Sequence, residues 1–155
     1  MTPSPSTTQG EAAQPTPGDV LIIVRDPFVR LLSDGVKVLE LRGHPPPAPV
    51  QRLMGTTTPL FFADKAVAGR SHVRGSARLV GSVEIRDEAA WRAARAEHRV
   101  DGTRASFMRM LGYTRLFGWC MERGTAAPCA PPVRRIVRSG PVVWDRFQPF
   151  KPTRI

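Results

Sequence analysis

Lys37, Glu40 and Arg42 stand close together in the stretch SDGVKVLELRGHPPP, residues 33–47. A lysine can serve as a base or nucleophile only where burial or a neighbouring cation lowers its pKa. A carboxylate beside it has the opposite effect, because it favours the charged ammonium. We therefore interpret this stretch as one wall of a ligand cleft, in which Lys37 and Arg42 contact an anion and Glu40 orients them.

The same trio also fits a simpler structure, an ion-paired hairpin corner in which Glu40 bridges to Arg42 or Lys37 on a solvated edge. Along a regular strand, Glu40 and Arg42 share one face while Lys37 points to the other. The turn at Gly35, or a bulge, must therefore bring the lysine in if the trio is to form one site.

The elements that position this stretch begin with an apolar, β-branched run at residues 20–24 (VLIIV), which predicts a buried strand. Asp26 followed by Pro27 predicts the start of a helix, since the fixed φ of proline suits the first turn and an aspartate can accept from its free amides. We expect Gly35 to end this helix and residues 36–42 to form the second strand.

The second half of the chain combines further strands with two helices. PLFFAD and SARLVGSVEI predict strands, whereas the glycine-punctuated, basic AVAGRSHVRG between them predicts a mobile loop. Asp87 and Thr103 are helix-capping residue types. The expected segments are strands at 59–64, 76–85, 116–123 and 141–147, the loop at 66–75, and helices from Asp87 to about Arg99 and from Thr103 to about Gly112.

Together these elements predict an α+β fold, a small mixed β-barrel of about six strands that is closed or nearly closed, with short helices covering its ends. A barrel of this size is filled by side chains, so a ligand must bind at its rim or beside an inserted helix. We expect one domain over residues 19–150. The Ser-, Thr- and Pro-rich residues 1–18 predict a disordered tail, and residues 151–155 a basic C-terminal tail.

The charge of the chain points to a polyanionic partner. Lysine and arginine number 23 against 13 acidic residues, a net charge of +10, and arginine both pairs with phosphate and stacks on bases. Arg92, Arg95 and Arg99 recur at helical spacing, which fits either a nucleic-acid contact or a solvated helix face. The other basic candidates are Arg25 and His44 beside the Lys37 stretch, Arg70, His72 and Arg74 in the loop, and Arg134, Arg135 and Arg138 near the C-terminus.

Aromatic residues are sparse at 7%, although readers of single-stranded RNA usually stack bases on exposed rings. We expect Trp91 and Tyr113 to be exposed, and Trp119, Trp144 and Met110 to pack in the core. Shape and phosphate contacts should therefore outweigh base reading.

We expect neither a metal nor a cofactor. Cys120 and Cys129 are too few and too far apart for a metal site, and His44, His72 and His98 fall in different elements. The start of the chain lacks a secretory-signal pattern, and no run approaches the roughly 18 apolar residues that cross a bilayer. These features predict a soluble, intracellular monomer, cytoplasmic or nuclear with an organelle not excluded, without a membrane partner.

Residues 24–42, VRDPFVRLLSDGVKVLELR, resemble the signature of the ASCH domain, a relative of the PUA fold. A strand ends in a polar-Pro-aromatic step, a helix follows, and the pattern Gly-x-Lys-x-x-Glu-x-Arg comes next as Gly35, Lys37, Glu40 and Arg42. The resemblance continues in order through residues 78–85, 101–111, 116–123 and 141–147, and covers nearly everything after residue 19.

This resemblance implies a PUA-like β-barrel with a cleft lined by that motif. The family is mainly RNA-binding or RNA-linked, and some members are small enzymes, described as ribonucleases or as an amidohydrolase acting on an acylated cytidine nucleoside. In the amidohydrolase branch a lysine, a threonine and a glutamate carry the chemistry. Lys37 matches the lysine, Glu40 holds the threonine position, and the nearest counterpart of the distant acid is Asp101.

Two functions therefore stay open. The first is an RNA-binding module, alone or as a subunit of a larger ribonucleoprotein, that contacts RNA or a nucleotide through a basic cleft and an Arg-rich surface. The second is a small hydrolase of a modified nucleoside or of RNA, with Lys37, Glu40 and Asp101 as catalytic residues. The candidate ligand-binding residues are Arg25, Lys37, Glu40, Arg42, His44, Arg70, Arg74, Arg92, Arg95, Arg99, Tyr113, Arg134 and Arg135.

Overall fold

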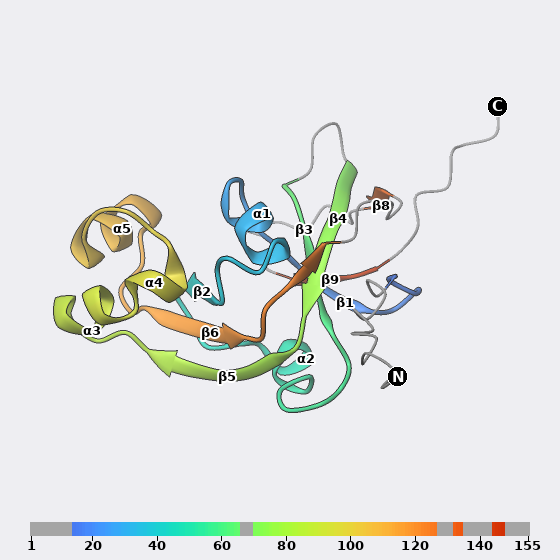
Figure 1. The fold of residues 1–155 in the computed structure, drawn as a ribbon, viewed down its shortest axis with the longest axis horizontal. Coiled ribbons are helices and arrows are strands. Elements are labelled where there is room, and N and C mark those ends of the chain that lie inside the picture. Colours follow the sequence, from blue (N-terminus) through green and yellow to red (C-terminus); the bar gives the residue numbers. More distant parts are fainter. Residues whose placement is uncertain (1–13, 66–69, 127–131, 135–143, 148–155) are drawn as a thin grey trace, which may run out of the picture.

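The computed structural model describes residues 14–65, 70–126, 132–134 and 144–147. Over these residues the fold is α+β, with two β-sheets and five short helices (Figure 1). None of the helices in this part of the chain is long and apolar enough to cross a membrane.

The larger sheet is built on two central strands, β1 (Val20–Ile23) and β3 (Leu60–Ala63), which run parallel. Every residue of both strands is buried, as expected for apolar runs covered on both faces of a sheet. The strand order is β7-β4-β3-β1-β9, and β8 pairs with β4 beside this path. The outer strands are β4 (Arg70–Ala77), β7 (Thr125–Ala126), β8 (Pro132–Arg134) and β9 (Trp144–Arg146).

The smaller sheet contains β2 (Leu39–Arg42), β6 (Phe117–Met121) and β5 (Leu79–Glu84), with β6 in the middle and both pairings antiparallel. Glu40 of β2 lies opposite Trp119 of β6. This pairing places the second half of the Lys37 stretch on a strand supported by a buried tryptophan.

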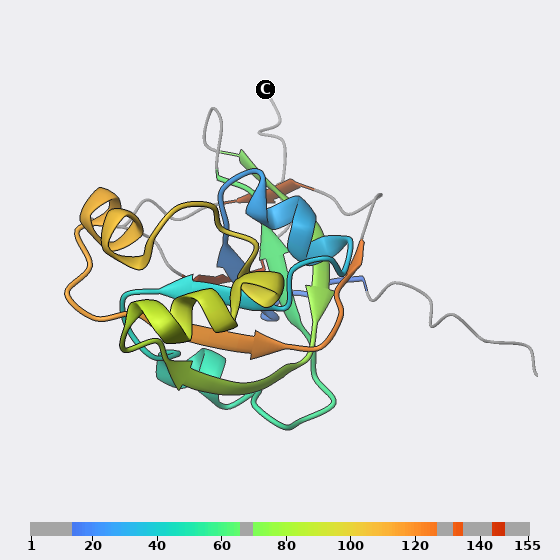
Figure 2. The same ribbon diagram turned by 60° about the vertical axis from the view of Figure 1, so that its left-hand side comes forward.

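Short helices cover the sheets (Figure 2). Helix α1 (Phe28–Ser33) packs on β3 and β4, and α4 (Arg95–His98) packs on β2. Helices α3 (Glu88–Ala93) and α5 (Arg104–Leu111) contact each other at the end of the smaller sheet, and α2 (Ala48–Gln51) lies on the far side of that sheet (Figure 1).

The hydrophobic residues form three clusters. The first lies between the two sheets and includes Ile22, Leu32 and Trp119. The second joins the smaller sheet to the helices α3 to α5, and includes Leu41 and Phe107. The third lies on the opposite face of the larger sheet. The second cluster is the one that fixes the helical end of the molecule against β2.

Predictions about individual large side chains had mixed outcomes. Trp119 is fully buried, as expected, and Trp144 is partly buried against the core. Trp91 is only 1% exposed and its Nε1 donates to the carbonyl oxygen of Gly102, so its predicted exposure was wrong. Met110 is 70% exposed instead of packed. The Trp91 ring packs against the rings of His98 in α4 and Phe107 in α5.

A break divides the single helix predicted from Asp87 to about Arg99. Asp87 caps α3 as expected, since its side chain accepts from Ala90 N. The helix is interrupted at Ala94, where the amide of Glu97 donates to the Ala94 carbonyl in a tighter i to i−3 turn. Arg99, with φ at 59°, ends α4.

The last predicted helix agrees with the structure. The Thr103 side chain accepts from Ser106 N at the start of α5, and Gly112 follows its end with φ at 69°. The Glu88 carboxylate also accepts from the amides of Arg104 and Ala105, which ties α3 to the first turn of α5.

The predicted cap of the first helix was wrong. The Asp26 side chain does not cap α1, and the carbonyl oxygen of Arg25 accepts from the amides of Phe28 and Val29 instead. These two amides are therefore satisfied by a backbone acceptor instead of the aspartate.

The predicted mobile loop at 66–75 was wrong from residue 70 onward, because these residues belong to β4. A Cβ on Gly75 would lie 2.6 Å from Ser33 Oγ and 2.6 Å from the Thr125 carbonyl oxygen. The glycine therefore marks close packing rather than a turn. Residues 66–69 lie outside the described residues.

The strand predicted at 76–85 is divided at Arg78, where β4 ends and β5 begins. The pairings of the described strands form two sheets and do not close a barrel, so the barrel remains a prediction. The described residues form nine strands instead of the expected six or so. The predicted 76–85 strand is two strands, and β7 and β8 are too short to give a periodic signal.

Residues 1–13 of the predicted N-terminal tail and 141–143 of the last predicted strand lie outside the described residues. The end of the predicted domain, 148–150, and the whole predicted C-terminal tail, 151–155, lie outside them as well. Gly18, at the end of the predicted N-terminal tail, donates through its amide to the carbonyl of Phe147. The Arg146 side chain in turn donates to the Gly18 carbonyl.

Gly124→Ala is expected to lower the free energy of unfolding by about 1–3 kcal/mol. A Cβ at this position would overlap the carbonyl oxygen of Leu32, which is held in the backbone of α1. Gly81→Ala is the matched control, since the nearest atom to its new Cβ would be Cys120 Cβ at an ordinary 3.9 Å. Urea denaturation followed by circular dichroism measures both, and equal stabilities would contradict this close packing of α1.

Candidate functional site

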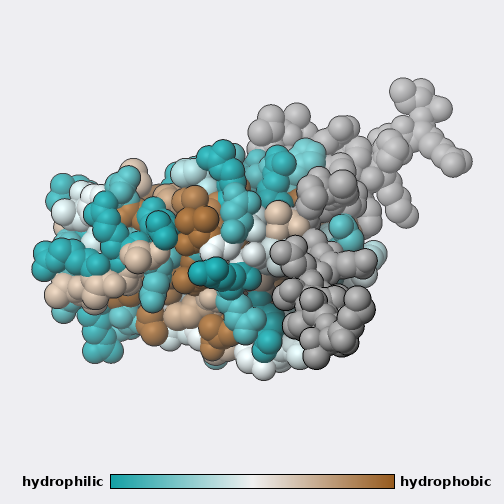
Figure 3. Space-filling view, in the orientation of Figure 1, coloured by the Kyte–Doolittle hydropathy of each residue, from teal (hydrophilic) through white to brown (hydrophobic). Residues whose placement is uncertain are grey.

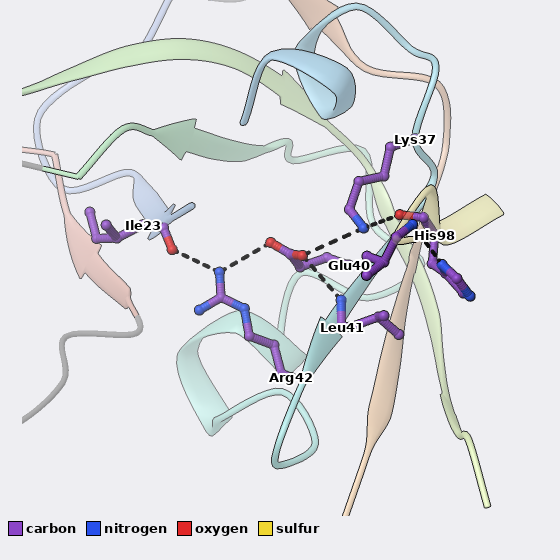
Figure 4. Close-up of polar contacts among 7 residues, drawn as sticks. Ile23, Lys37, Glu40, Leu41, Arg42 and His98 are labelled. Atoms are coloured by element: carbon purple, nitrogen blue, oxygen red, sulfur yellow. Dashed lines mark hydrogen bonds and ion pairs between the residues drawn. The ribbon is translucent and has the colours of Figure 1, made fainter. Parts of the chain in front are cut away.

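The site is centred on Glu40, whose carboxylate lies between two cations (Figure 4). Its Oε1 is 3.8 Å from Lys37 Nζ, and its Oε2 accepts a 3.2 Å hydrogen bond from Arg42 Nη2. Oε1 also accepts from the amide of Leu41 at 3.1 Å. Glu40 is 5% exposed, so these donors compensate the burial of its charge.

Lys37 is a buried cation, with 1% of its surface exposed. Its Nζ donates to the carbonyl oxygen of His98 and lies 4.9 Å from the centre of the Phe28 ring. Burial lowers the pKa of Lys37 from an ordinary 10.5 to about 8, while Glu40 acts to raise it and Arg42 to lower it further. Near neutral pH, Lys37 therefore keeps its proton in most molecules but has a neutral fraction that an exposed lysine lacks.

Lys37 reaches the carboxylate because residues 36–38 are not part of a strand. Two backbone amides of this segment donate to the Leu31 carbonyl at the end of α1, and a third donates to the Glu97 carbonyl in α4. The segment thus crosses between two helix ends before β2 begins. The strand predicted over 36–42 was wrong in its first half, and the expected opposite orientation of the lysine does not apply.

His98 fixes the end of α4 beside the lysine. Its ring is fully buried, with its centre 4.3 Å from that of the Trp91 ring. Nδ1 accepts from the amide of Val100 at 2.9 Å, which assigns the ring proton to Nε2, and Nε2 donates to the Trp91 carbonyl at 3.0 Å. Burial lowers the pKa of His98 against the opposing effect of this last bond. The ring is therefore neutral, and the backbone carbonyl is what contacts Lys37.

Arg42 is held on the other side of Glu40. Its Nη2 also donates to the carbonyl of Ile23 at 2.7 Å, and its guanidinium carbon lies 5.5 Å from the centre of the Trp119 ring. Trp119 Nε1 donates to the backbone carbonyl of His44. His44 is exposed, and its ring packs edge-on against the Trp119 ring with the ring centres 5.8 Å apart. The Arg42 side chain is 12% exposed, so part of it remains available to a ligand.

An open cavity of about 80 Å³ adjoins Glu40. Pockets that enclose whole small molecules span about 300–1,000 Å³, so this cavity accommodates only one part of a ligand. Figure 3 shows apolar atoms on the surface between α1 and the helical end of the molecule, with hydrophilic side chains around them. The lining residues are Ile23, Val24, Arg25, Phe28, Glu40, Leu41, Arg42, Val100, Phe107, Leu111 and Tyr113.

The structure thus brings Arg25, Glu40, Arg42 and Tyr113 together at one cavity. Arg25 is exposed and Tyr113 is partly buried. Lys37 lies behind Glu40 with its side chain 0% exposed, so it holds the carboxylate and does not face the cavity.

Asp101 lies elsewhere. Its side chain is 98% exposed, and its Oδ1 accepts from Arg95 Nη2 at 2.7 Å. It shares a separate, shallow hollow on α3 and α4 with the three arginines of the predicted stripe. All three arginines are exposed, and Arg99 Nε donates to the carbonyl of Ala96.

The remaining basic candidates belong to the larger sheet. Arg74 is exposed on β4 and pairs with Asp64 at 2.7 Å. The backbone of Arg70 in β4 pairs with that of Arg134 in β8. Arg135 lies outside the described residues.

Sequence reasoning missed three contributors to the site. Phe28 and Phe107 line the cavity, although neither is among the predicted ligand-binding residues. His98 was considered only as a metal ligand. No local pattern identifies its carbonyl as the acceptor for a lysine 61 residues away.

The described part of the chain contains no group of three or more His, Cys, Asp or Glu side chains that could hold a metal ion. Cys120 is a free, partly buried thiol, and Cys129 lies outside the described residues.

The buried ammonium predicts a pH-dependent stability difference between the natural chain and Lys37→Met. Lys37 has a pKa of about 8 when folded and 10.5 when unfolded. Between these values the unfolded chain holds a proton that the folded chain has lost, so the free energy of unfolding rises with pH. The methionine variant lacks this gain. Between pH 8 and 10.5, the free energy of unfolding of the variant is expected to fall further below that of the natural chain, by up to about 3 kcal/mol.

Urea denaturation of both proteins at pH 7.5, 9 and 10 measures this deficit. Other groups titrate in both chains and cancel in the difference. A deficit that stays constant over this range would show that Lys37 titrates normally in the folded state.

Comparisons with family models and with curated proteins find no match. Solved structures do match. The crystal structure of an ASCH protein from Zymomonas mobilis superposes with a TM-score of 0.58 at 14% identity, covering 84% of this chain and 88% of that one. Two point variants of that protein also match, each with a TM-score of 0.58 at 15% identity. They cover 86% and 84% of this chain, and this chain covers 91% of each of them. The chain therefore has the ASCH-type fold that its sequence resembles.

Proposed function

We propose that this protein binds RNA or a nucleotide through the cavity beside Glu40. The observation that carries this proposal is the presence at one cavity of aromatic rings and partly accessible arginines. Phe28 and Tyr113 offer ring surfaces to a base, and Arg25 and Arg42 are suited to phosphate.

The charge of the surface supports a polyanionic partner. The chain carries a net charge of +10, and Arg92, Arg95 and Arg99 are exposed at a separate hollow on α3 and α4. Each arginine that meets a phosphate adds salt-sensitive affinity. The same surface serves either a free monomeric module or a subunit of a larger ribonucleoprotein.

A hydrolase is the second candidate, and one observation favours it. Lys37 has a pKa of about 8 beside a carboxylate, and a neutral lysine amine is a nucleophile or base. Against this, Lys37 does not line the cavity, and Asp101 pairs with Arg95 on the surface. The residues expected to be catalytic therefore do not converge on one substrate position, and we favour binding.

Arg25→Gln is expected to weaken the binding of a short single-stranded RNA by at least about fivefold and to lower the salt slope of log K by about 0.7, because one phosphate contact is lost. Arg52→Gln removes the same charge from an exposed residue outside the cavity, and its affinity should stay within about twofold of the natural chain. Fluorescence anisotropy at several KCl concentrations compares the two. Equal losses would mean that net charge alone drives binding.

The hydrolase alternative predicts that acetate is released from an acylated cytidine and that Lys37→Met abolishes the release. The binding function predicts RNA affinity without acetate release. Both are measured on the same samples, with circular dichroism to confirm that the variant is folded. Turnover that depends on Lys37, together with weak RNA binding, would replace our proposal with hydrolysis.

A further inference from the structure

Resting on the proposed function, we infer that the cavity reads one unpaired base through Glu40 and selects guanine. Glu40 is the acidic residue among the cavity-lining side chains. Its carboxylate has acceptors only, so the group that meets it must bring N–H or O–H donors. A phosphate is itself an acceptor and an anion, and therefore contacts arginine at the mouth instead.

The number of free acceptor sites on Glu40 limits which donor groups a ligand can place against it. Each carboxylate oxygen can accept about two hydrogen bonds. Oε1 already accepts from the Leu41 amide, and Oε2 from Arg42. By this hydrogen-bond count one site remains on each oxygen, with Lys37 Nζ facing Oε1 in an ion pair at 3.8 Å, beyond hydrogen-bond distance. A ligand with two adjacent donors suits these two sites.

Guanine is the RNA base that offers this pair, because its N1–H and N2–H lie side by side on the pairing edge. Adenine and cytosine place a ring-nitrogen acceptor next to their amino group on that edge, and uracil flanks its single N–H with two carbonyl oxygens. Each of these three would therefore turn at least one lone pair toward the carboxylate. Uracil is the poorest match.

The carboxylate is held in place before a ligand arrives. Lys37 supports it from behind, Arg42 from the side, and the Leu41 amide from its own strand. Lys37 is itself fixed by the His98 carbonyl. An acceptor with so little freedom gives up little entropy on binding and cannot turn away from a mismatched base.

The rest of the cavity fits a flat base inserted edge first. The cavity admits one part of a ligand, and its other walls are largely apolar, with aromatic rings from Phe28, Phe107 and Tyr113. Arg25 is exposed at the same cavity and lies within reach of a backbone phosphate outside it. Because the pairing edge of the base is engaged by protein, the guanine must come from a single-stranded segment.

The test uses five-nucleotide RNAs that have four uridines around a central guanosine, inosine, adenosine, cytidine or uridine. Inosine lacks only the N2 amino group of guanosine. Anisotropy titrations of the natural chain are expected to give about tenfold or tighter binding for central guanosine than for central uridine, with inosine in between.

Glu40→Gln keeps the size of the side chain but replaces one acceptor with a donor. It is expected to abolish the difference between guanosine and inosine, and to bring the guanosine-to-uridine affinity ratio within about twofold. Because each ratio is taken within one protein, a partly unfolded fraction cancels. Arg25→Gln should weaken all five RNAs alike and leave their ratios unchanged.

The outcomes separate this inference from the proposed function. Equal affinity for all five RNAs, or a guanosine preference that survives Glu40→Gln, would overturn guanine reading by Glu40 while RNA binding stands. The absence of salt-sensitive binding to any of them would overturn both.

Discussion

Burial of the Lys37 ammonium is the constraint on which the arrangement of the site depends. A charge removed from water must be compensated by nearby acceptors, or its cost falls on the stability of the fold. Here the compensation comes from the His98 carbonyl of α4, the Glu40 carboxylate of β2 and the ring face of Phe28 in α1. Two neighbouring elements, α1 and β2, and the distant α4 must therefore keep their relative positions.

This arrangement gives the cavity its polarity. Glu40 would be costly to bury alone, but Lys37 and Arg42 occupy its sides and leave part of the carboxylate next to the cavity. Both cations mainly neutralise Glu40 and are little exposed to a ligand: the Lys37 side chain is inaccessible and that of Arg42 is 12% exposed. The accessible positive charge at the mouth comes from Arg25. The cavity thus combines a buried acceptor, Glu40, with an exposed cation, Arg25.

The ASCH-type fold leaves the activity open, because one fold can carry different chemistry in the same cleft. What distinguishes this chain is the set of groups at that cleft. By its resemblance to the amidohydrolase pattern, this chain has a glutamate, Glu40, at the threonine position, and in the structure this glutamate pairs with Lys37. A lysine that neutralises a neighbour in this way is tied to it and poorly placed to attack a substrate. This pairing is one of the observations on which our proposal of recognition over catalysis rests.

The sequence by itself determined the local features of this protein. Capping residues such as Asp87 and Thr103 marked two helix starts, apolar runs marked β1 and β3, and the spacing of Glu40 and Arg42 marked the site. Only the tertiary structure decided that Lys37 turns inward to the His98 carbonyl, that α3 and α4 are separate helices, and that Asp101 faces solvent. Capping and periodicity report on neighbours within one turn or strand, whereas the burial of a charge depends on acceptors that the chain brings together from distant segments.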